Sequence, residues 1–340
     1  MRNVFRNLGP NWYASVMGTG IVANAAILLP VHMPVLNSFA LGVWMLAAAL
    51  LVALTLATTV HWIRYPENAR RHHRDPAMAP FYGAPPMAML TVGAGAFLVG
   101  RDLIGLPAAI TVDEVLWTLG TVTGLVSTIA IPYLMFTQHD LELKNTLGTW
   151  LMPIVPPMVS AATGAALIAH VPAGQDRLAL LLCCYAMFGI SLLASLIIIT
   201  LLWGRLAYEG VGPARTVPTL WIVLGPLGQS ITAVGLLANA APSAIPQPYA
   251  TAMRATAVLY GMPVWGFALV WLLLAAAITL RTTRRHLPFS LTWWAWLTAA
   301  TRTAHGFISG RLFLPPPDGL AYHASRPSSR EIARPLSITG

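Results

Sequence analysis

Four apolar segments of this chain carry short clusters of glycine, hydroxyl and amide residues. The clusters are SVMGTG (Ser15–Gly20), TVGAGA (Thr91–Ala96), SAATGA (Ser160–Ala165) and GPLGQS (Gly225–Ser230), and they recur with a period of about 70 residues. Hydroxyl and amide groups can offer hydrogen bonds to a solute. The chemistry that this pattern suggests is passage of a solute along a weakly polar path.

Two interpretations of the clusters are open. Glycine and other small residues also let membrane helices approach closely, with no solute involved. The recurrence in four segments favours a conduit over four separate packing contacts. The residues expected to line such a path are Ser15, Gly18, Thr19, Gly20, Thr91, Gly93, Gly95, Pro156, Pro157, Ser160, Thr163, Gly164, Pro226, Gln229, Ser230 and Thr232.

Prolines lie inside two of these apolar segments. Proline removes a backbone hydrogen bond and disrupts the preceding helical turn. The freed carbonyls are tolerated at membrane depth only where protein or a water-filled cavity satisfies them. We therefore expect Pro156 and Pro157 to break the fifth segment, and Pro226 to mark a second inward-facing helix.

The composition defines the broad class of protein. Hydrophobic residues make up 56% of the 340 residues and charged residues only 9%, with a mean hydropathy of +0.67, whereas a soluble domain carries about 25% charged residues. These values predict an all-α integral membrane protein. The net charge of +9 does not come from a basic patch interleaved with aromatic residues, so we expect no nucleic-acid partner.

The apolar segments that must position the clusters predict eight membrane spans and the start of a ninth near Leu287. The eight cover residues 11–29, 37–62, 86–103, 113–136, 146–169, 176–203, 218–239 and 251–280. The odd-numbered spans carry the clusters and the even-numbered spans are mostly Leu, Ala and Val. We expect repeated helical hairpins, with odd helices in an inner ring and even helices in an outer ring. An uncleaved first helix is favoured over a signal peptide, because Gly18, Thr19 and Gly20 interrupt its apolar run.

Lysine and arginine are distributed unequally between alternate connecting segments. Residues expected on the cytoplasmic side are Arg2, Arg6, Arg64, Arg70, Arg71, Arg74, Lys144, Arg205, Arg215, Arg281, Arg284 and Arg285. This bias predicts a cytoplasmic N-terminus in a plasma (inner) membrane. Arg101 and Arg254, near the other side, could attract anions at the mouths or pair with Asp102, Asp113 or lipid headgroups. His72, His73 and Asp75 are expected in a solvated loop.

The sequence offers little for catalysis. It contains no Walker A loop, and no paired carboxylates or His–Glu constellation at membrane depth, so we expect no enzyme, no metal and no cofactor. The adjacent Cys183 and Cys184 are expected to be small buried or lipid-facing residues. With no ring of fixed negative charge, anions are more plausible solutes than cations.

Five motifs together resemble the tellurite-resistance/dicarboxylate transporter family. They are WYASVMGTGIVA (Trp12–Ala23), PYLMFTQHDLEL (Pro132–Leu143), MPIVPPMVSAATGA (Met152–Ala165), GPLGQSITAVGLL (Gly225–Leu237) and LPFSLTWWA (Leu287–Ala295). That family includes malic acid permeases, sulfite efflux pumps, the bacterial tellurite-resistance protein and the plant slow anion channel.

The resemblance implies a fold of ten helices in five hairpins, with the odd helices lining a pore, and a homotrimer with one pore in each protomer. It implies small anions as substrates, with four-carbon dicarboxylates such as malate favoured over sulfite, tellurite-related anions, chloride or nitrate. A non-transporting scaffold or sensor on the same fold is the alternative class. The family's gating phenylalanine has no counterpart here, because neither Phe289 nor Phe307 matches its position.

The family pattern stops at Ala295. The apolar run Leu287–Ala300 is short of a full span, and extending it would place Arg302 and His305 in the membrane. We expect a transmembrane domain over residues 1–300 and a disordered Arg/Pro/Ser-rich tail over 301–340. The ten-helix fold would then be truncated in helix nine, through a reading-frame change or a natural variant tail, and the chain could be inactive.

Overall fold

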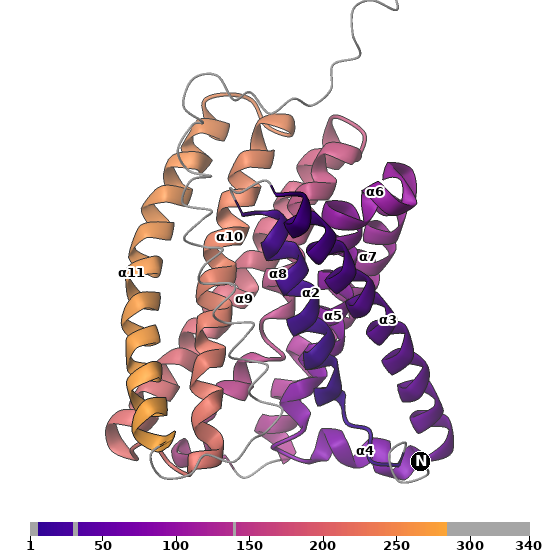
Figure 1. Cartoon of the computed structure of the whole chain (residues 1–340). Coiled ribbons are helices and arrows are strands. Elements are labelled where there is room, and N and C mark those ends of the chain that lie inside the picture. The colour runs from indigo at the N-terminus through magenta and orange to yellow at the C-terminus, as the bar shows by residue number, and fades with distance from the viewer. Residues whose placement is uncertain (1–5, 30–32, 139–140, 284–340) are drawn as a thin grey trace, which may run out of the picture.

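The computed structural model describes residues 6–29, 33–138 and 141–283, and helices dominate these residues (Figure 1). The ninth span, the loss of family pattern after Ala295 and the tail over 301–340 lie outside the described residues, so those expectations stay predictions. Within the described part, the all-helical fold class is confirmed.

The helices pack as four hairpins, each made of a shorter helix followed by a longer one. The pairs are α2 (Tyr13–Ile27) with α3 (Pro34–Arg64), α5 (Ala84–Gly95) with α7 (Leu106–Gln138), α8 (Pro156–Leu167) with α9 (Gln175–Tyr208), and α10 (Leu224–Ala240) with α11 (Tyr249–Thr283). Each shorter helix carries one of the four polar clusters. The shorter helices also contact one another in chain order, α2 with α5, α5 with α8 and α8 with α10.

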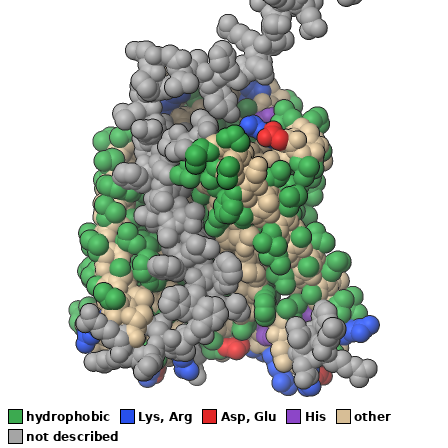
Figure 2. Space-filling view, in the orientation of Figure 1, with side chains coloured by type: hydrophobic (Ala, Val, Ile, Leu, Met, Phe, Trp, Pro, Cys, Tyr) green, Lys and Arg blue, Asp and Glu red, His purple; other side chains and the backbone are tan. Residues whose placement is uncertain are grey.

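The shorter helices are buried and the longer ones are exposed. Within the most apolar stretch of residues 214–243, which includes α10, 89% of residues are buried, against 17% for Tyr249–Thr283. Apolar side chains cover the visible flank of the molecule and charged ones gather at its two ends (Figure 2). A large apolar flank of this kind is typical of a surface that faces lipid in a membrane protein.

Six helical stretches in the described residues are long and apolar enough to cross a membrane. They correspond to six of the eight expected spans. The other two expected spans, 11–29 and 146–169, contain helices of only 15 and 12 residues, α2 and α8. At about 1.5 Å per residue these helices reach roughly 22 and 18 Å, less than a hydrocarbon core of about 30 Å.

A tight helical segment precedes each of the four shorter helices. These segments are 3₁₀ helices: η1 (Pro10–Trp12), η2 (Ala79–Gly83), η5 (Gly148–Leu151) and η7 (Ala214–Val223). Proline is well suited to the start of an α-helix, where its missing N–H has no partner to lose. Pro156 and Pro157 are the first two residues of α8, so the expected span 146–169 is broken at the prolines, and they begin a helix instead of lying in the middle of one.

The segment after α3 also differs from the expectation. Residues Pro66–Arg74 form a short helix, α4, instead of a solvated loop. Tyr82 donates from its hydroxyl to the carbonyl of Ala69 (3.4 Å), and Ala69 is the fully buried residue of α4. At the opposite end of the molecule, five residues with π-helical geometry (Ala96–Gly100) join α5 to the one-turn helix α6 (Arg101–Ile104).

Candidate functional site

The residues expected to line a path lie on α2, α5, α8 and α10, and most of them are buried. Ser15, Thr19 and Thr163 are half-buried, whereas Thr91, Ser160, Gln229, Ser230 and Thr232 are buried. The hydroxyls of both threonines on α5 and α8 donate to the carbonyl one turn earlier: Thr91 to Met87 (2.7 Å) and Thr163 to Val159 (2.9 Å). The oxygen lone pairs of these two hydroxyls can still accept a hydrogen bond, whereas their protons are already donated to backbone carbonyls.

Four further hydroxyls behave in the same way. The serines of α2, α8 and α10 and Thr232 donate to backbone carbonyls three or four residues earlier, at 2.7 to 3.2 Å. Ser160 also accepts a hydrogen bond from Thr121 of α7 at 2.9 Å. Bonding within a helix lets these hydroxyls be buried without a solute, because a buried polar group is costly only when it has no partner.

Four of the expected glycines lie against neighbouring helices. A Cβ on Gly20 would lie 2.8 Å from Thr91 Cγ2, and one on Gly164 would lie 2.8 Å from Cys184 Sγ. A Cβ on Gly93 would meet Asp113, and one on Gly95 would meet Trp44. These positions match the close-packing interpretation, since each glycine admits a neighbouring side chain.

The longer helices supply hydrogen-bond donors to the broken start of α8. The carbonyl of Pro153 would accept from residue 157 in a continuous helix, but Pro157 has no N–H. Thr128 of α7 donates to it instead, at 2.8 Å. Ser191 of α9 donates to the next carbonyl, that of Ile154, at 2.7 Å. Side chains of the flanking helices thus satisfy the carbonyls of the irregular segment.

Tryptophan indole groups of the longer helices also donate hydrogen bonds to backbone carbonyls of the buried segments. Trp44 of α3 donates to the carbonyl of Val92 in α5 (3.1 Å), and Trp117 of α7 donates to that of Ser160 in α8 (2.9 Å). Trp271 of α11 donates to Leu220 in η7 (2.9 Å). From α2, Asn24 donates to Thr91 (3.0 Å). These bonds fix the depth and rotation of the buried helices, including those that carry the clusters.

The 3₁₀ segments touch one another through glycines. Gly83 of η2 lies directly against the carbonyl of Met152, and Gly148 of η5 lies directly against the carbonyl of Thr219 in η7. No side chain would fit at either position without moving backbone. Each repeat unit therefore closes on the next one at the end of the molecule that also holds α4.

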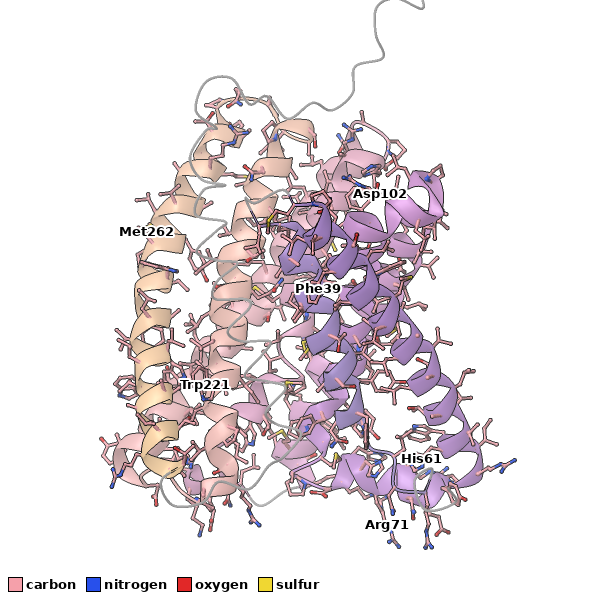
Figure 3. All side chains as sticks on the ribbon, viewed as in Figure 1. Phe39, His61, Arg71, Asp102, Trp221 and Met262 are labelled. Atoms are coloured by element: carbon pink, nitrogen blue, oxygen red, sulfur yellow. The ribbon has the colours of Figure 1, made fainter. Side chains whose placement is uncertain are left out.

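The two arginines expected at the mouths are both exposed. Arg101 lies next to Asp102, with Nε 3.9 Å from Oδ1, which is one of the pairings that the sequence left open. Figure 3 shows Asp102 at the end of the molecule opposite to Arg71 and His61. Arg254 is exposed on α11. In the described residues neither arginine reaches into the buried helices.

Two buried charged residues were not foreseen as such. Asp113 was expected at a span end, but α7 begins at Leu106 and the side chain is 1% exposed, with no hydrogen-bond partner for its oxygens among the described residues. Arg205 was expected in a connecting loop, yet it is 2% exposed. It donates to the carbonyls of Thr146 (3.0 Å) and Val211 (2.6 Å). Neither was detectable from the sequence, because both lie beside predicted span ends whose position is uncertain by several residues.

The described residues contain no cluster of three or more His, Cys, Asp or Glu side chains that could hold a metal. Cys183 is exposed on α9 and Cys184 is buried, as the sequence suggested for small lipid-facing or buried residues. What remains is a helical membrane protein whose buried helices are short, begin irregularly and carry hydroxyl clusters. This arrangement places the protein among multi-pass membrane proteins, and the described residues show no evident catalytic centre.

Comparison with known proteins gives the family. The family model described as "SLAC1: Voltage-dependent anion channel" matches residues 7–297. The chain therefore belongs to the SLAC1 (tellurite-resistance/dicarboxylate transporter) family of membrane anion transporters and channels, as its five motifs indicated, and it is not an enzyme.

Several curated relatives share the family. An uncharacterized transporter of Methanocaldococcus jannaschii is 26% identical over 297 residues, covering 87% of this chain and 81% of the relative. The sulfite efflux pump SSU1 of Trichophyton rubrum is 26% identical over 295 residues, covering 85% and 78%. A putative malic acid transport protein of Schizosaccharomyces pombe is 21% identical over 300 residues, covering 85% and 68%.

Proposed function

We propose that this protein moves small oxyanions across the membrane along a path between α2, α5, α8 and α10. The observation that carries the proposal is that these four helices are buried, share a hydroxyl cluster and each follow an irregular segment. The irregular segments bring the starts of the four helices together at the end of the molecule that holds α4. An inner ring of these helices inside an outer ring of α3, α7, α9 and α11 is part of the proposal.

The substrate class follows from the absence of fixed negative charge among the path residues and from the relatives. Sulfite is the first candidate, because relatives named sulfite efflux pumps reach 26 to 27% identity over 85% of the chain. A four-carbon dicarboxylate such as malate, which the sequence analysis favoured, is the second candidate, supported by the malic acid transport relative. Chloride and nitrate are further alternatives.

Flux measurements in proteoliposomes test this proposal. We expect labelled sulfite or malate, and not rubidium, to enter vesicles that contain the protein, with rates above those of empty vesicles. Replacing Gln229 by Leu should lower flux severalfold, because this buried amide lies in the α10 cluster. Thr256→Val is the matched control, since Thr256 is exposed on α11 and bonds only its own helix at Ala252.

The result that would refute a transport function is equally clear. If folded protein gave no flux of any of these anions above empty vesicles, a scaffold or sensor role would replace transport. If Gln229→Leu and Thr256→Val reduced flux equally, the α10 cluster would not line the path.

We further propose that the N-terminus is cytoplasmic in the plasma membrane and that the protein forms a homotrimer. The cation bias supports the orientation, and Figure 2 shows arginine and lysine gathered at the end of the molecule that holds α4. Labelling an engineered cysteine at Arg70 from either side of sealed cells would test the orientation. Native mass spectrometry would test the trimer, and a monomer would overturn it.

A further inference from the structure

A polar cavity lies beside α4, away from the clusters of the proposed path. Its volume is about 430 Å³, and its described lining is Arg6, Asn7, Asn68, Arg71 and His72. Small-molecule sites commonly occupy about 300–1,000 Å³. The lining supplies two guanidinium groups, two amides and an imidazole, and it includes no carboxylate.

The cavity has a fixed framework. Asn68 donates from its side chain to the carbonyl of Arg6 at 3.0 Å, which ties the N-terminal segment to α4. The ring of His72 stacks on that of His61, with centroids 5.4 Å apart and planes 18° apart. His61 is 1% exposed at the end of α3. These two contacts join the N-terminal segment to α4, and α4 to the end of α3.

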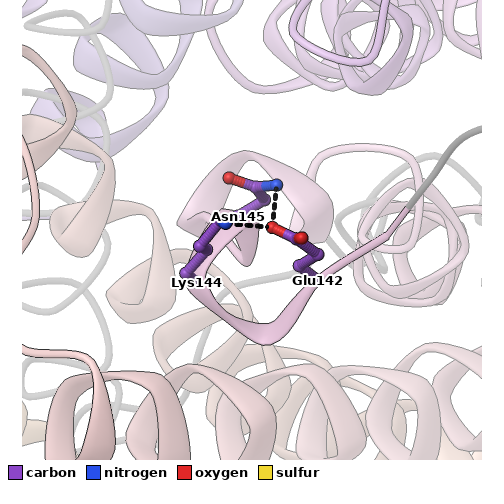
Figure 4. Close-up of polar contacts among 3 residues, drawn as sticks. All are labelled: Glu142, Lys144 and Asn145. Atoms are coloured by element: carbon purple, nitrogen blue, oxygen red, sulfur yellow. Dashed lines mark hydrogen bonds and ion pairs between the residues drawn. The ribbon is translucent and has the colours of Figure 1, made fainter.

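The guanidinium groups in the cavity lack acidic partners. Neither Arg6 nor Arg71 forms an ion pair within the described chain. Another cation expected at this end, Lys144, does have one: its Nζ lies 2.6 Å from Glu142, which Asn145 also contacts (Figure 4). Unlike Lys144, the two arginines are therefore not engaged by a carboxylate. Arginine is also the side chain best suited to bidentate binding of phosphate.

Two acids lie close in sequence to the cavity residues, Glu67 within α4 and Asp75 directly after it. Asp75 accepts from the backbone N–H of Ala77 at 2.9 Å and so closes its own turn. Glu67 is exposed and is not part of the described lining. No acid within the described lining pairs with the two guanidinium groups, which lie at the end of the molecule where α3 leaves the apolar flank (Figure 3).

We propose that this cavity binds a phosphate group through Arg6 and Arg71, with Asn7 and Asn68 as further polar contacts. Phosphate presents several acceptor oxygens to such a set of donors and carries the charge that two guanidinium groups require. The group comes either from an anionic lipid headgroup, since basic segments beside a span attract anionic lipids, or from a free phosphate compound. The site is independent of the proposed transport path.

The experiment uses the full chain in detergent and compares two single charge removals. Arg71→Gln removes a guanidinium from the cavity. Arg70→Gln removes the same charge from the adjacent residue, which is exposed and outside the described lining. Both residues are exposed, so neither change should disturb folding, and size-exclusion profiles would verify this.

One arm titrates inorganic phosphate by calorimetry, and the other counts phosphatidylglycerol molecules retained in native mass spectra, with phosphatidylcholine as the neutral reference. In whichever arm the wild type binds, Arg71→Gln should weaken binding about tenfold and Arg70→Gln less than twofold. Retention of phosphatidylglycerol alone identifies a lipid headgroup, whereas binding of inorganic phosphate identifies a free phosphate source.

Equal losses in the two variants would overturn the proposal, because they would reveal only diffuse surface charge. Absence of binding in both arms would overturn it as well. If sulfite or malate displaced the bound phosphate at the concentrations that half-saturate flux, the cavity would be a vestibule of the transport path and not a separate site.

Discussion

Replacing Thr128 by Val tests whether the longer helices hold the broken helix α8 in place. The substitution keeps the side-chain shape but removes the hydroxyl that donates to the carbonyl of Pro153 at 2.8 Å. Ser127 lies 3.5 Å from the same oxygen and is a poor substitute. An unsatisfied buried carbonyl costs about 1–3 kcal/mol, and hydrogen bonds within membrane proteins average about 0.6 kcal/mol. We expect a loss of about 1–2 kcal/mol.

The loss should depend on Pro157. Alanine at position 157 restores a backbone N–H that can donate to the carbonyl of Pro153. Thr128→Val should therefore cost less than half as much free energy in a Pro157→Ala background. Thr123→Val is the control, since Thr123 is exposed on the same helix and bonds its own Leu119 at 2.6 Å. That control should remain within about 0.5 kcal/mol of wild type.

Unfolding in mixed micelles, followed by circular dichroism over a titration of denaturing detergent, measures these free energies. Thr128→Val indistinguishable from Thr123→Val would show that the carbonyl finds another partner. A strictly additive double variant would show that Pro157 is not the reason for the bond.

Three further results are expected. Trp44→Phe should destabilise the protein by about 1–2 kcal/mol in the same assay, because it leaves the buried carbonyl of Val92 without its indole donor. Gly164→Ala should lower the melting temperature in detergent, whereas Gly189→Ala, with nothing within 4 Å of its added Cβ, should not. Burial, and then the nearby charge of His61, keep the pKa of His72 below 6.5, with Asp75 opposing. Retention of phosphatidylglycerol, whose phosphodiester keeps its single charge, should therefore rise as the pH falls below about 6.5, and native mass spectra from samples prepared at two pH values measure it.

Much of the fold could be predicted because hydrophobic runs and the period of the clusters are strong signals. The four hairpins and the burial of the helices that carry clusters followed from runs such as 218–239 and 251–280. The helix starts could not be predicted. Pro156 and Pro157 were expected to break the fifth span, but the sequence does not reveal that the residues before them, 148–155, form tight turns beside η7.

The site was predicted less completely than the fold. Hydroxyl residues were found through their repeat, but their partners within the helix were not, because such bonds leave no mark on sequence pattern. Asp113 and Arg205 were missed as buried charges, since burial here depends on helix ends one or two turns away from the predicted ones. The helix α4 was missed because its charged sequence is typical of a solvated loop.

The partners of the hydroxyls bear on how the proposed path would work. Thr91, Ser160 and Thr163 already donate to carbonyls one turn earlier. An anion that recruits one of these protons must replace that bond, so it gains only the difference between two bonds, each worth about 0.5–1.5 kcal/mol net. A millimolar dissociation constant corresponds to about −4.1 kcal/mol. Conduction needs binding that is weak enough for release, and a path lined by internally bonded hydroxyls meets that condition, favouring throughput over affinity.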